Sequence, residues 1–227
     1  MASIISQDSL EIVRATAPVV KDHALKITGT FYPKMLARNP ELFAFFNESN
    51  QRVGRQAGAF SEFLSGGRTE EDGLMASAQQ RTLADAVIAY ALNIENLESL
   101  SETVTRIAHK HCALGVKPEH YQIVHDNLME AIGEVLASAV TPEVAAAWSE
   151  AVTALAKVFI EVESKLYNEA SEKQWVGNRE FSIVEVIQET PRVKSLRLKP
   201  TDGNGIAPFI PGQYVTCLLY TSDAADE

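Results

Sequence analysis

The segment Arg106–Tyr121, "RIAHKHCALGVKPEHY", holds three of the five histidines in this chain of 227 residues. The apolar pattern predicts a helix that ends soon after His111, with Ile107, Ala108 and Leu114 around that histidine. His109 is two residues away and therefore points to roughly the opposite face. A histidine that ligates a metal must be neutral, rigidly held and oriented through its second ring nitrogen. His111 is the candidate for that role.

The kind of metal site is restricted by what surrounds His111. A structural zinc site needs four ligands at short spacings, but the chain has only two cysteines, Cys112 and Cys217, and no His-x3-His pair on one face. Haem iron needs a single protein ligand on its proximal side. A lone histidine on a helix is most often an ordinary core or surface residue, so haem ligation is a hypothesis that other residues must support.

The rest of the sequence divides into two regions with different patterns of apolar residues. From Ser6 to about Asn168 the apolar residues recur every three or four positions, which predicts about seven helices, one of them interrupted at Pro33. The polar stretch "SEKQWVGN" follows. After it, "REFSIVEVIQE" and "VKSLRLKP" alternate apolar and polar residues, as strands do. The sequence therefore predicts an all-helical domain followed by the first strands of an all-β domain.

Composition excludes several classes of protein. Apolar residues make up 46% of the chain, enough for a real core, and the net charge of −10 argues against a nucleic-acid groove. No apolar run reaches the ~20 residues of a membrane span, and the N-terminus has no signal-peptide pattern. We therefore expect a cytoplasmic protein with no nucleic-acid partner and no membrane span.

The last eleven residues, "CLLYTSDAADE" at 217–227, resemble the translation of a sequencing adapter. We expect this tail to be non-native and exclude it from fold reasoning, as one would an expression tag. The natural protein is then expected to continue beyond Thr216.

Six motifs occur in an order that is typical of one family: "FYPKML", "NPELFAFFNESNQR", "YALNIENL", "KHCALGVKPEHY", "VFIEVESKLYNE" and "FIPGQY". With them the chain resembles a flavohaemoglobin over residues 1–216, apart from one insertion. The resemblance implies an all-α globin fold followed by the truncated start of a β-barrel, the FAD domain of the ferredoxin-reductase type. The expected divisions are a haem-binding globin domain at 1–168, a linker at 169–178, an incomplete FAD-binding barrel at 179–216 and the adapter-like tail.

On this resemblance His111 is the proximal ligand of haem b. Tyr32 matches the family's distal tyrosine, whose hydroxyl donates a hydrogen bond to bound oxygen and so stabilises its partial negative charge. Phe46 matches the phenylalanine that packs on the haem face. From sequence alone Tyr32 and Phe46 could equally be core aromatics.

Two proximal residues match a family pair around the histidine, namely Tyr121 and Glu163. A carboxylate near the ring N–H gives the imidazole more imidazolate character, which favours O–O activation over oxygen storage. Lys110 matches a family lysine linked to the haem potential. Without the resemblance, Glu163 and Lys110 would be interpreted as solvated helix residues.

The distal glutamine is where the sequence departs from the family. Residues 56–78 are additional, and because Gln56 and Gln79 are the same residue type, either could be the distal glutamine. Gln79 has Leu83 four residues on, which puts both on one helix face, and Gln56 has Phe60 at the same spacing. We prefer the Gln79–Leu83 pair because its helix continues unbroken into "YALNIENL". The insertion itself is expected to form a surface loop and a helix extension.

The implied activity of the parent protein is that of a nitric oxide dioxygenase, in which NAD(P)H reduces FAD, FAD reduces haem, and O2 converts nitric oxide to nitrate. Tyr214, in "PGQY", matches a tyrosine that contacts flavin, but the downstream flavin motif and nicotinamide domain are absent. This chain is thus expected to bind haem and O2 without its own reductase. The alternatives are a single-domain globin that stores or senses oxygen, and a haem-free helical signalling domain.

Overall fold

A computed structural model of the chain describes residues 5–46, 78–173, 175, 177–209, 211–213, 215 and 217, with no side-chain description for 78, 79 and 97. Three sequence expectations lie outside these residues. They are the insertion 56–78 except for Ala78, the flavin-contacting Tyr214, and the adapter-like tail except for Cys217.

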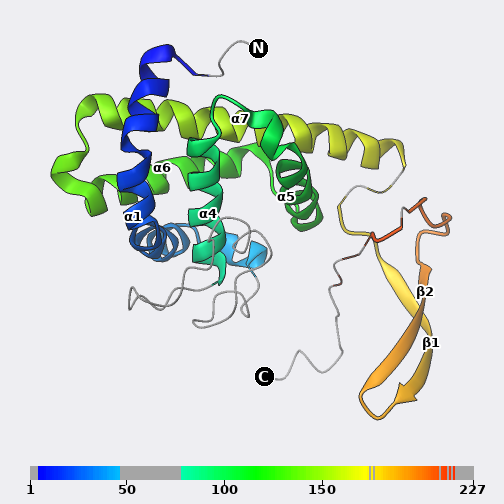
Figure 1. The fold of residues 1–227 in the computed structure, drawn as a ribbon. Helices are drawn as coiled ribbons and strands as arrows, with labels where there is room; N and C mark the ends of the chain where they lie inside the picture. Colours follow the sequence, from blue (N-terminus) through cyan, green and yellow to red (C-terminus); the bar gives the residue numbers. More distant parts are fainter. Residues whose placement is uncertain are drawn as a thin grey trace.

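The described residues from Ile5 to Lys173 form helices joined by short connections (Figure 1). The elements are α1 (Gln7–Arg38), η1 (Pro40–Phe45), α4 (Ala78–Leu92), η2 (Leu97–Leu100), α5 (Ser101–Leu114), α6 (Pro118–Leu136), η3 (Ala137–Ala139) and α7 (Pro142–Glu172), where η marks a short 3-10 helix. The expected all-helical region is confirmed. Its last helix ends at Glu172, four residues into the stretch expected to be a linker.

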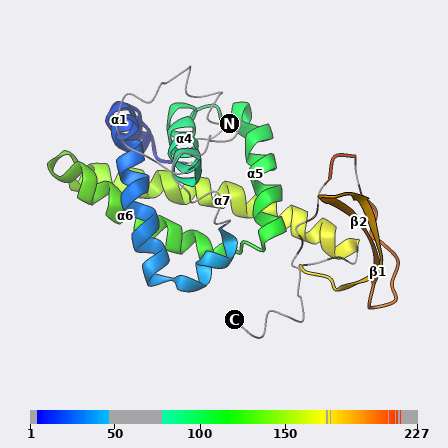
Figure 2. The same cartoon turned by 90° about the horizontal axis from the view of Figure 1, so that it is seen from below.

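The expected interruption at Pro33 is wrong, because α1 continues through that residue to Arg38. A proline inside a helix removes one backbone donor and bends the helix, but it need not end it. Phe31, Tyr32, Met35 and Leu36 on either side are buried, so core packing holds the helix together there. Figures 1 and 2 show α1 as two limbs that meet at a sharp bend about midway along the helix, so this bend is not the interruption expected near its end.

The core lies where α1 packs against α4, α6 and α7, whereas α5 packs mainly against α7. The largest fully buried side chain of the core is Trp148 of α7, whose indole N–H donates to Thr16 Oγ1 at 2.9 Å. Because α5 rests on α7, the position of His111 depends on α7. No helix within the described ranges is both long enough and apolar enough to cross a membrane.

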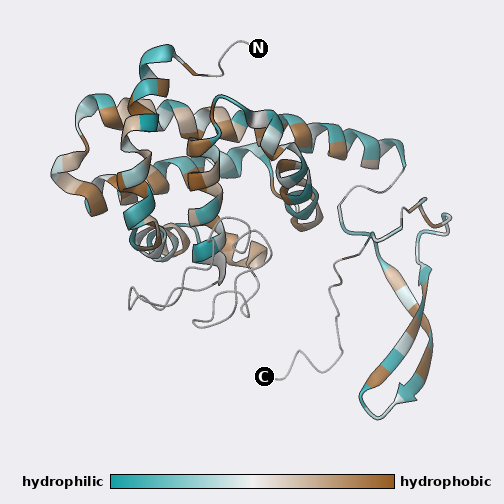
Figure 3. Ribbon diagram, viewed as in Figure 1, coloured by the Kyte–Doolittle hydropathy of each residue, from teal (hydrophilic) through white to brown (hydrophobic). Residues whose placement is uncertain are grey.

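Beyond α7, the strands β1 (Phe181–Thr190) and β2 (Val193–Pro200) form an antiparallel hairpin, with Phe181 opposite Pro200 and Thr190 opposite Val193. The expected strands are confirmed. Figure 3 shows hydrophobic residues along both strands, and most of them are exposed. At the base of the hairpin the Arg179 guanidinium donates to both Asp202 carboxylate oxygens at 2.8 Å and lies over the Trp175 and Phe181 rings.

Candidate functional site

The turn that carries His111 is fixed at the end of α5. Gly115 adopts a left-handed conformation, with φ of 80°, and its N–H bonds back to the carbonyl of Cys112. The N–H of Val116 bonds to the carbonyl of His111 at 3.0 Å, so the last carbonyls of the helix are satisfied. The Tyr167 hydroxyl of α7 donates to the carbonyl of Val116 at 2.7 Å. The backbone on both sides of the histidine is thereby held, and α7 holds it.

Two side chains, from α6 and α7, converge on His111 of α5. Its Nδ1 lies 2.8 Å from Glu163 Oε1 and 3.0 Å from the Tyr121 hydroxyl, and the Tyr121 hydroxyl donates to the same Oε1 at 2.5 Å. Glu163 is only 2% exposed. A buried carboxylate is costly unless it is hydrogen-bonded, and here it receives two donors. The structure therefore brings together the three proximal residues that the sequence singled out.

This geometry decides which nitrogen of His111 carries the proton. Since Oε1 is a carboxylate oxygen that already accepts from Tyr121, Nδ1 must be the donor toward Glu163. In a neutral imidazole Nε2 then keeps its lone pair. Within the described part of the chain Nε2 makes no hydrogen bond, and the side chain is 31% exposed. The ring thus offers one oriented, unprotonated nitrogen, as a metal ligand must.

Two titratable groups near His111, the Tyr121 hydroxyl and the Cys112 thiol, are kept protonated by their surroundings. Burial, followed by the hydrogen bond to Glu163, raises the pKa of Tyr121 far above its usual range, so its hydroxyl remains a donor. Burial and then the Glu163 charge raise the pKa of Cys112 to about 11. A thiol with that pKa is not a thiolate at neutral pH and does not compete as a metal ligand.

Phe159 belongs to this site, although sequence analysis did not single it out. Its ring lies 5.6 Å from the His111 ring and is stacked on Tyr121 at 6.3 Å. Phe159 is one helical turn before Glu163, so both reach α5 from the same face of α7. That spacing was the available signal, but an aromatic residue at helical spacing is more often only a core residue.

Of the residues expected on the distal side, the structure describes the side chains of three. Tyr32 of α1 is 5% exposed and meets Phe46 edge-on, with ring centroids 5.7 Å apart. Phe46 and Leu83 of α4 are partly buried against the same core cluster that contains Tyr32. These three residues are thus gathered in one apolar region. Gln79 falls in α4 but its side chain is outside the description, and Gln56 lies outside the described residues.

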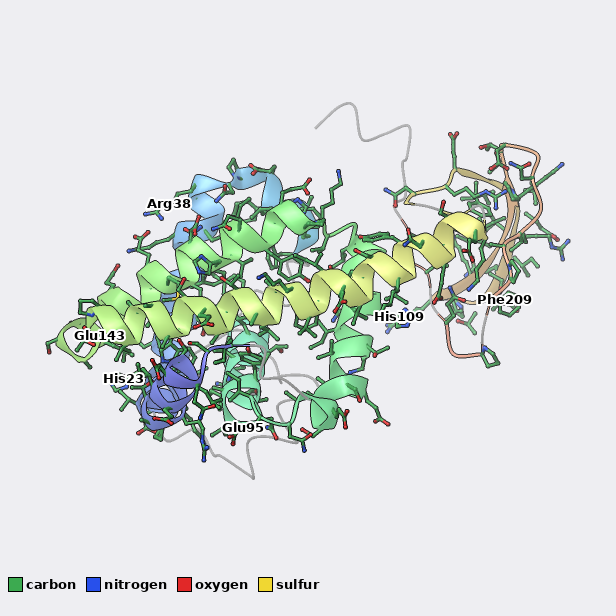
Figure 4. All side chains as sticks on the ribbon, turned by 90° about the horizontal axis from the view of Figure 1, so that it is seen from above. His23, Arg38, Glu95, His109, Glu143 and Phe209 are labelled. Atoms are coloured by element: carbon green, nitrogen blue, oxygen red, sulfur yellow. The ribbon has the colours of Figure 1, made fainter. Side chains whose placement is uncertain are left out.

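The other residues around the segment are not part of the His111 cluster. Lys110 and His109 are exposed on α5, and Figure 4 labels His109. The His120 ring accepts the Lys117 N–H at 3.0 Å and lies against Phe45. His125 contacts Asp126 and Ser149. His120 and His125 are therefore engaged in contacts within and between helices.

The donor set fits haem. A single neutral histidine, oriented by a carboxylate through Nδ1, is what haem iron requires of a protein on its proximal side. His111 would hold the iron, with Phe159 beside the ring, while Tyr32, Phe46 and Leu83 would line the opposite side.

Comparison with known proteins gives the same result. A family model for globins matches residues 29–159. A flavohaemoprotein from Oceanobacillus iheyensis is 40% identical over 215 residues, which are 94% of this chain and 47% of that protein. The crystal structure of a Malassezia yamatoensis flavohaemoglobin with bound FAD and haem is 29% identical, with a TM-score of 0.73 over 96% of this chain and 51% of that one. A bacterial globin from Campylobacter jejuni is 30% identical, with a TM-score of 0.56 over 72% of this chain and 99% of its own.

The globin structure and the flavohaemoglobin structure cover different shares of this chain. The bacterial globin covers 72% of this chain, whereas the flavohaemoglobin covers 96% of it, a share that includes strands after α7. The chain spans about half the length of the curated relatives it matches. The resemblance to a flavohaemoglobin and the expected fold class are confirmed. The chain belongs to the globin family.

Proposed function

We propose that this chain binds haem b through His111 and serves as the oxygen-binding part of a nitric oxide dioxygenase. The observation that carries the proposal is the buried Glu163 carboxylate, 2.8 Å from His111 Nδ1. An oxygen-storage globin has no need of a buried charge on its proximal histidine. A carboxylate partner makes the imidazole a stronger electron donor, which favours reactions that reduce oxygen.

Each proximal residue has a distinct part in this proposal. Glu163 holds the Nδ1 proton of His111 and fixes the rotation of the ring, so that Nε2 faces the ligand position. Tyr121 donates to the same oxygen and holds the carboxylate in place. Haem, when bound, supplies the position where O2 binds and accepts electrons.

On the distal side the buried Tyr32 hydroxyl would act as a hydrogen-bond donor where negative charge develops. Phe46 would exclude water from that side. The net reaction combines one nitric oxide, one O2 and one electron into one nitrate ion. In a parent protein as long as the relatives, the electrons would pass from NAD(P)H to FAD and from FAD to haem. Tyr214 would be the residue that contacts the flavin.

A second candidate is a single-domain globin that only binds or senses oxygen. The hairpin β1–β2 disfavours it, because a globin of that kind has no use for strands after its last helix. The buried Glu163 disfavours it as well.

The first experiment is a haemin titration of the whole chain, followed by ferrous and ferrous-CO absorption spectra. The wild type is expected to take up one haem with a histidine-ligated spectrum, and His111→Ala is expected to lose that spectrum. His109→Ala is the matched control, because it removes an exposed histidine from the same helix turn and should change nothing. Loss of the spectrum in both variants, or in neither, would overturn His111 as the ligand.

The second experiment measures nitrate formed from nitric oxide and O2 with a supplied electron donor. Glu163→Gln is expected to keep its haem but to turn over roughly ten- to a hundredfold more slowly, as is usual when a partner of a metal ligand is changed. Glu161→Gln, on the exposed side of the same helix, is the control. Equal turnover in wild type and Glu163→Gln would overturn the role given to Glu163, and no nitrate from the haem-loaded wild type would favour the oxygen-binding alternative.

A further inference from the structure

Tyr167 belongs to a row of α7 residues that face the end of α5. Phe159, Glu163 and Tyr167 follow one another at intervals of one helical turn, so they lie on one face of α7. Phe159 and Glu163 contact the His111 ring. The Tyr167 hydroxyl instead donates to the backbone carbonyl of Val116 at 2.7 Å. The proposed function uses Glu163 directly and gives no part to Tyr167.

Val116 is the residue through which Tyr167 can act. It lies in the connection between α5, which ends at Leu114, and α6, which begins at Pro118. Its N–H donates to the carbonyl of His111 at 3.0 Å. Its own carbonyl belongs to neither helix and accepts from no backbone N–H of the described residues, so the Tyr167 hydroxyl satisfies it. This hydrogen bond ties the connection between the two helices to α7.

Two of the three proximal residues are attached to this connection. His111 lies just before it on α5, and Tyr121 lies just after it, at the start of α6. The third residue, Glu163, is on α7 itself. Fixing Val116 to α7 therefore fixes His111 and Tyr121 with respect to the carboxylate that both of them contact.

A second point of attachment matters because the first one is a pivot. Among the described residues, the hydrogen bonds that join His111 and Cys112 to α7 both end on Glu163, one at its Oε1 at 2.8 Å and one at its carbonyl oxygen at 3.8 Å. The Tyr167 contact lies one turn, about 5.4 Å, further along α7 and opposes rotation of the end of α5 about Glu163. Hydrogen bonds weaken as they depart from a straight line, so such a rotation would weaken the bond from His111 Nδ1.

The Tyr167 hydroxyl remains a donor at neutral pH. Burial, followed by the neighbouring Cys112 thiol, raises the pKa of Tyr167 well above its usual range.

We propose that Tyr167 is a positioning residue of the proximal site: through Val116 it holds His111 at the angle at which Glu163 makes the imidazole a strong electron donor. This inference rests on the proposed function, because it concerns His111 as the ligand of haem.

The test compares Tyr167→Phe with the wild type in the haem-loaded chain. The substitution keeps the aromatic ring and removes only the donor, so the variant is expected to fold and to bind one haem. The measurement is the frequency of the iron–histidine stretching band in the resonance Raman spectrum of the ferrous state without O2 or CO. This frequency rises as the partner of Nδ1 makes the imidazole more basic. We expect the band of Tyr167→Phe to lie below that of the wild type, and the band of Glu163→Gln to lie lower still.

Nitrate formation with a supplied electron donor gives a second measurement. We expect Tyr167→Phe to turn over more slowly than the wild type by up to about tenfold, less than the loss expected for Glu163→Gln, because the carboxylate is still present.

Thr16→Val is the matched control. It also removes a single hydroxyl hydrogen bond, the one from the Trp148 indole, and so lowers stability, but Trp148 lies about four turns before Glu163 on α7. At a temperature at which all variants are folded, its band is expected to match that of the wild type. An unchanged band in Tyr167→Phe, or an equal shift in Thr16→Val, would overturn this inference and leave the proposed function intact. A wild type that gives no histidine-ligated haem spectrum would overturn both.

Discussion

Two tyrosines near His111 differ in the acceptor to which they donate. Tyr121 donates to the buried Glu163 carboxylate, whereas Tyr167 donates to the neutral carbonyl of Val116. Hydrogen bonds to charged groups are worth more than those to neutral groups. We therefore expect Tyr121→Phe to lower the free energy of unfolding by about 1.5–3 kcal/mol and Tyr167→Phe by about 1 kcal/mol. Urea denaturation of the two variants measures both values, and the reverse order would show that the carboxylate is not buried with Tyr121 as its partner.

Glu130 gives stability a dependence on pH. Its carboxylate accepts from the Arg38 guanidinium at 2.5 and 3.0 Å and from Lys34 at 3.1 Å, and these contacts lower its pKa from 4.5 to about 2. A carboxyl group whose pKa is lower in the folded state stabilises the fold above its unfolded pKa, and loses that effect as pH falls toward its folded pKa. The contribution is therefore present above pH 4.5 and disappears as the pH falls to about 2.

The matching experiment compares the melting temperature of the wild type with that of Glu130→Gln across this window. The wild type is expected to melt higher above pH 4.5, and the difference is expected to vanish by about pH 2. Because the groups are at the surface, added salt should shrink the difference at every pH. Glu161→Gln, which removes an exposed glutamate from α7, should show no such trend.

At the scale of the element, two glycines in neighbouring helices predict opposite effects of the same change. Gly115 ends α5 with φ of 80°, and Gly133 lies inside α6; a Cβ built at either one meets no atom within 4 Å. Gly115→Ala forces an L-residue into the left-handed region and is expected to cost about 1–2 kcal/mol. Gly133→Ala removes chain entropy from the unfolded state and is expected to stabilise by about 0.4–1 kcal/mol.

Thermal unfolding of the two variants measures these signs directly. Since Gly115 follows His111 by one turn, Gly115→Ala should also weaken haem uptake in the titration, whereas Gly133→Ala should leave it unchanged. Stabilisation by both substitutions would mean that the end of α5 does not hold the left-handed turn.

The elements themselves could mostly be predicted from the sequence. Pro118 and Pro142 sit at the first positions of α6 and α7, where a missing N–H costs nothing, and the period of two marked β1 and β2. The error at Pro33 has a tertiary cause, because the buried residues around it hold α1 together through the core. α7 continues four residues beyond its expected end at Asn168, because no glycine or proline follows there to stop the helix.

The site was less accessible to sequence patterns than the helices that carry it. His111 and Glu163 are 52 residues apart, and helical periodicity cannot say that α5 packs on α7 so that they touch. Only the resemblance to a family paired them. Phe159 depends on the same packing: it lies within the motif "VFIEVESKLYNE", but the motif could not say that its ring reaches His111. What the sequence alone could supply was the chemical argument that a lone histidine on an apolar helix suits haem.

For the whole molecule, the exposed faces of the hairpin predict self-association. Val186 and Leu196 are paired across the strands and are 54% and 42% exposed, among several other exposed apolar residues. A two-stranded sheet with apolar residues in water is only marginally stable and offers edges and faces to another chain. We expect the apparent mass from light scattering to rise with concentration in the wild type. The double variant Val186→Lys, Leu196→Lys is expected to remove that rise.

The control for this experiment is Ser195→Lys, which adds a positive charge to the same strand without removing an apolar side chain. It should associate as the wild type does, apart from the small effect of one charge. If Ser195→Lys abolished association as fully as the double variant, charge repulsion would be the cause and the apolar faces would not be. If the wild type kept a constant single-chain mass at all concentrations, the hairpin would have to be protected within one chain by contacts that the described residues do not provide.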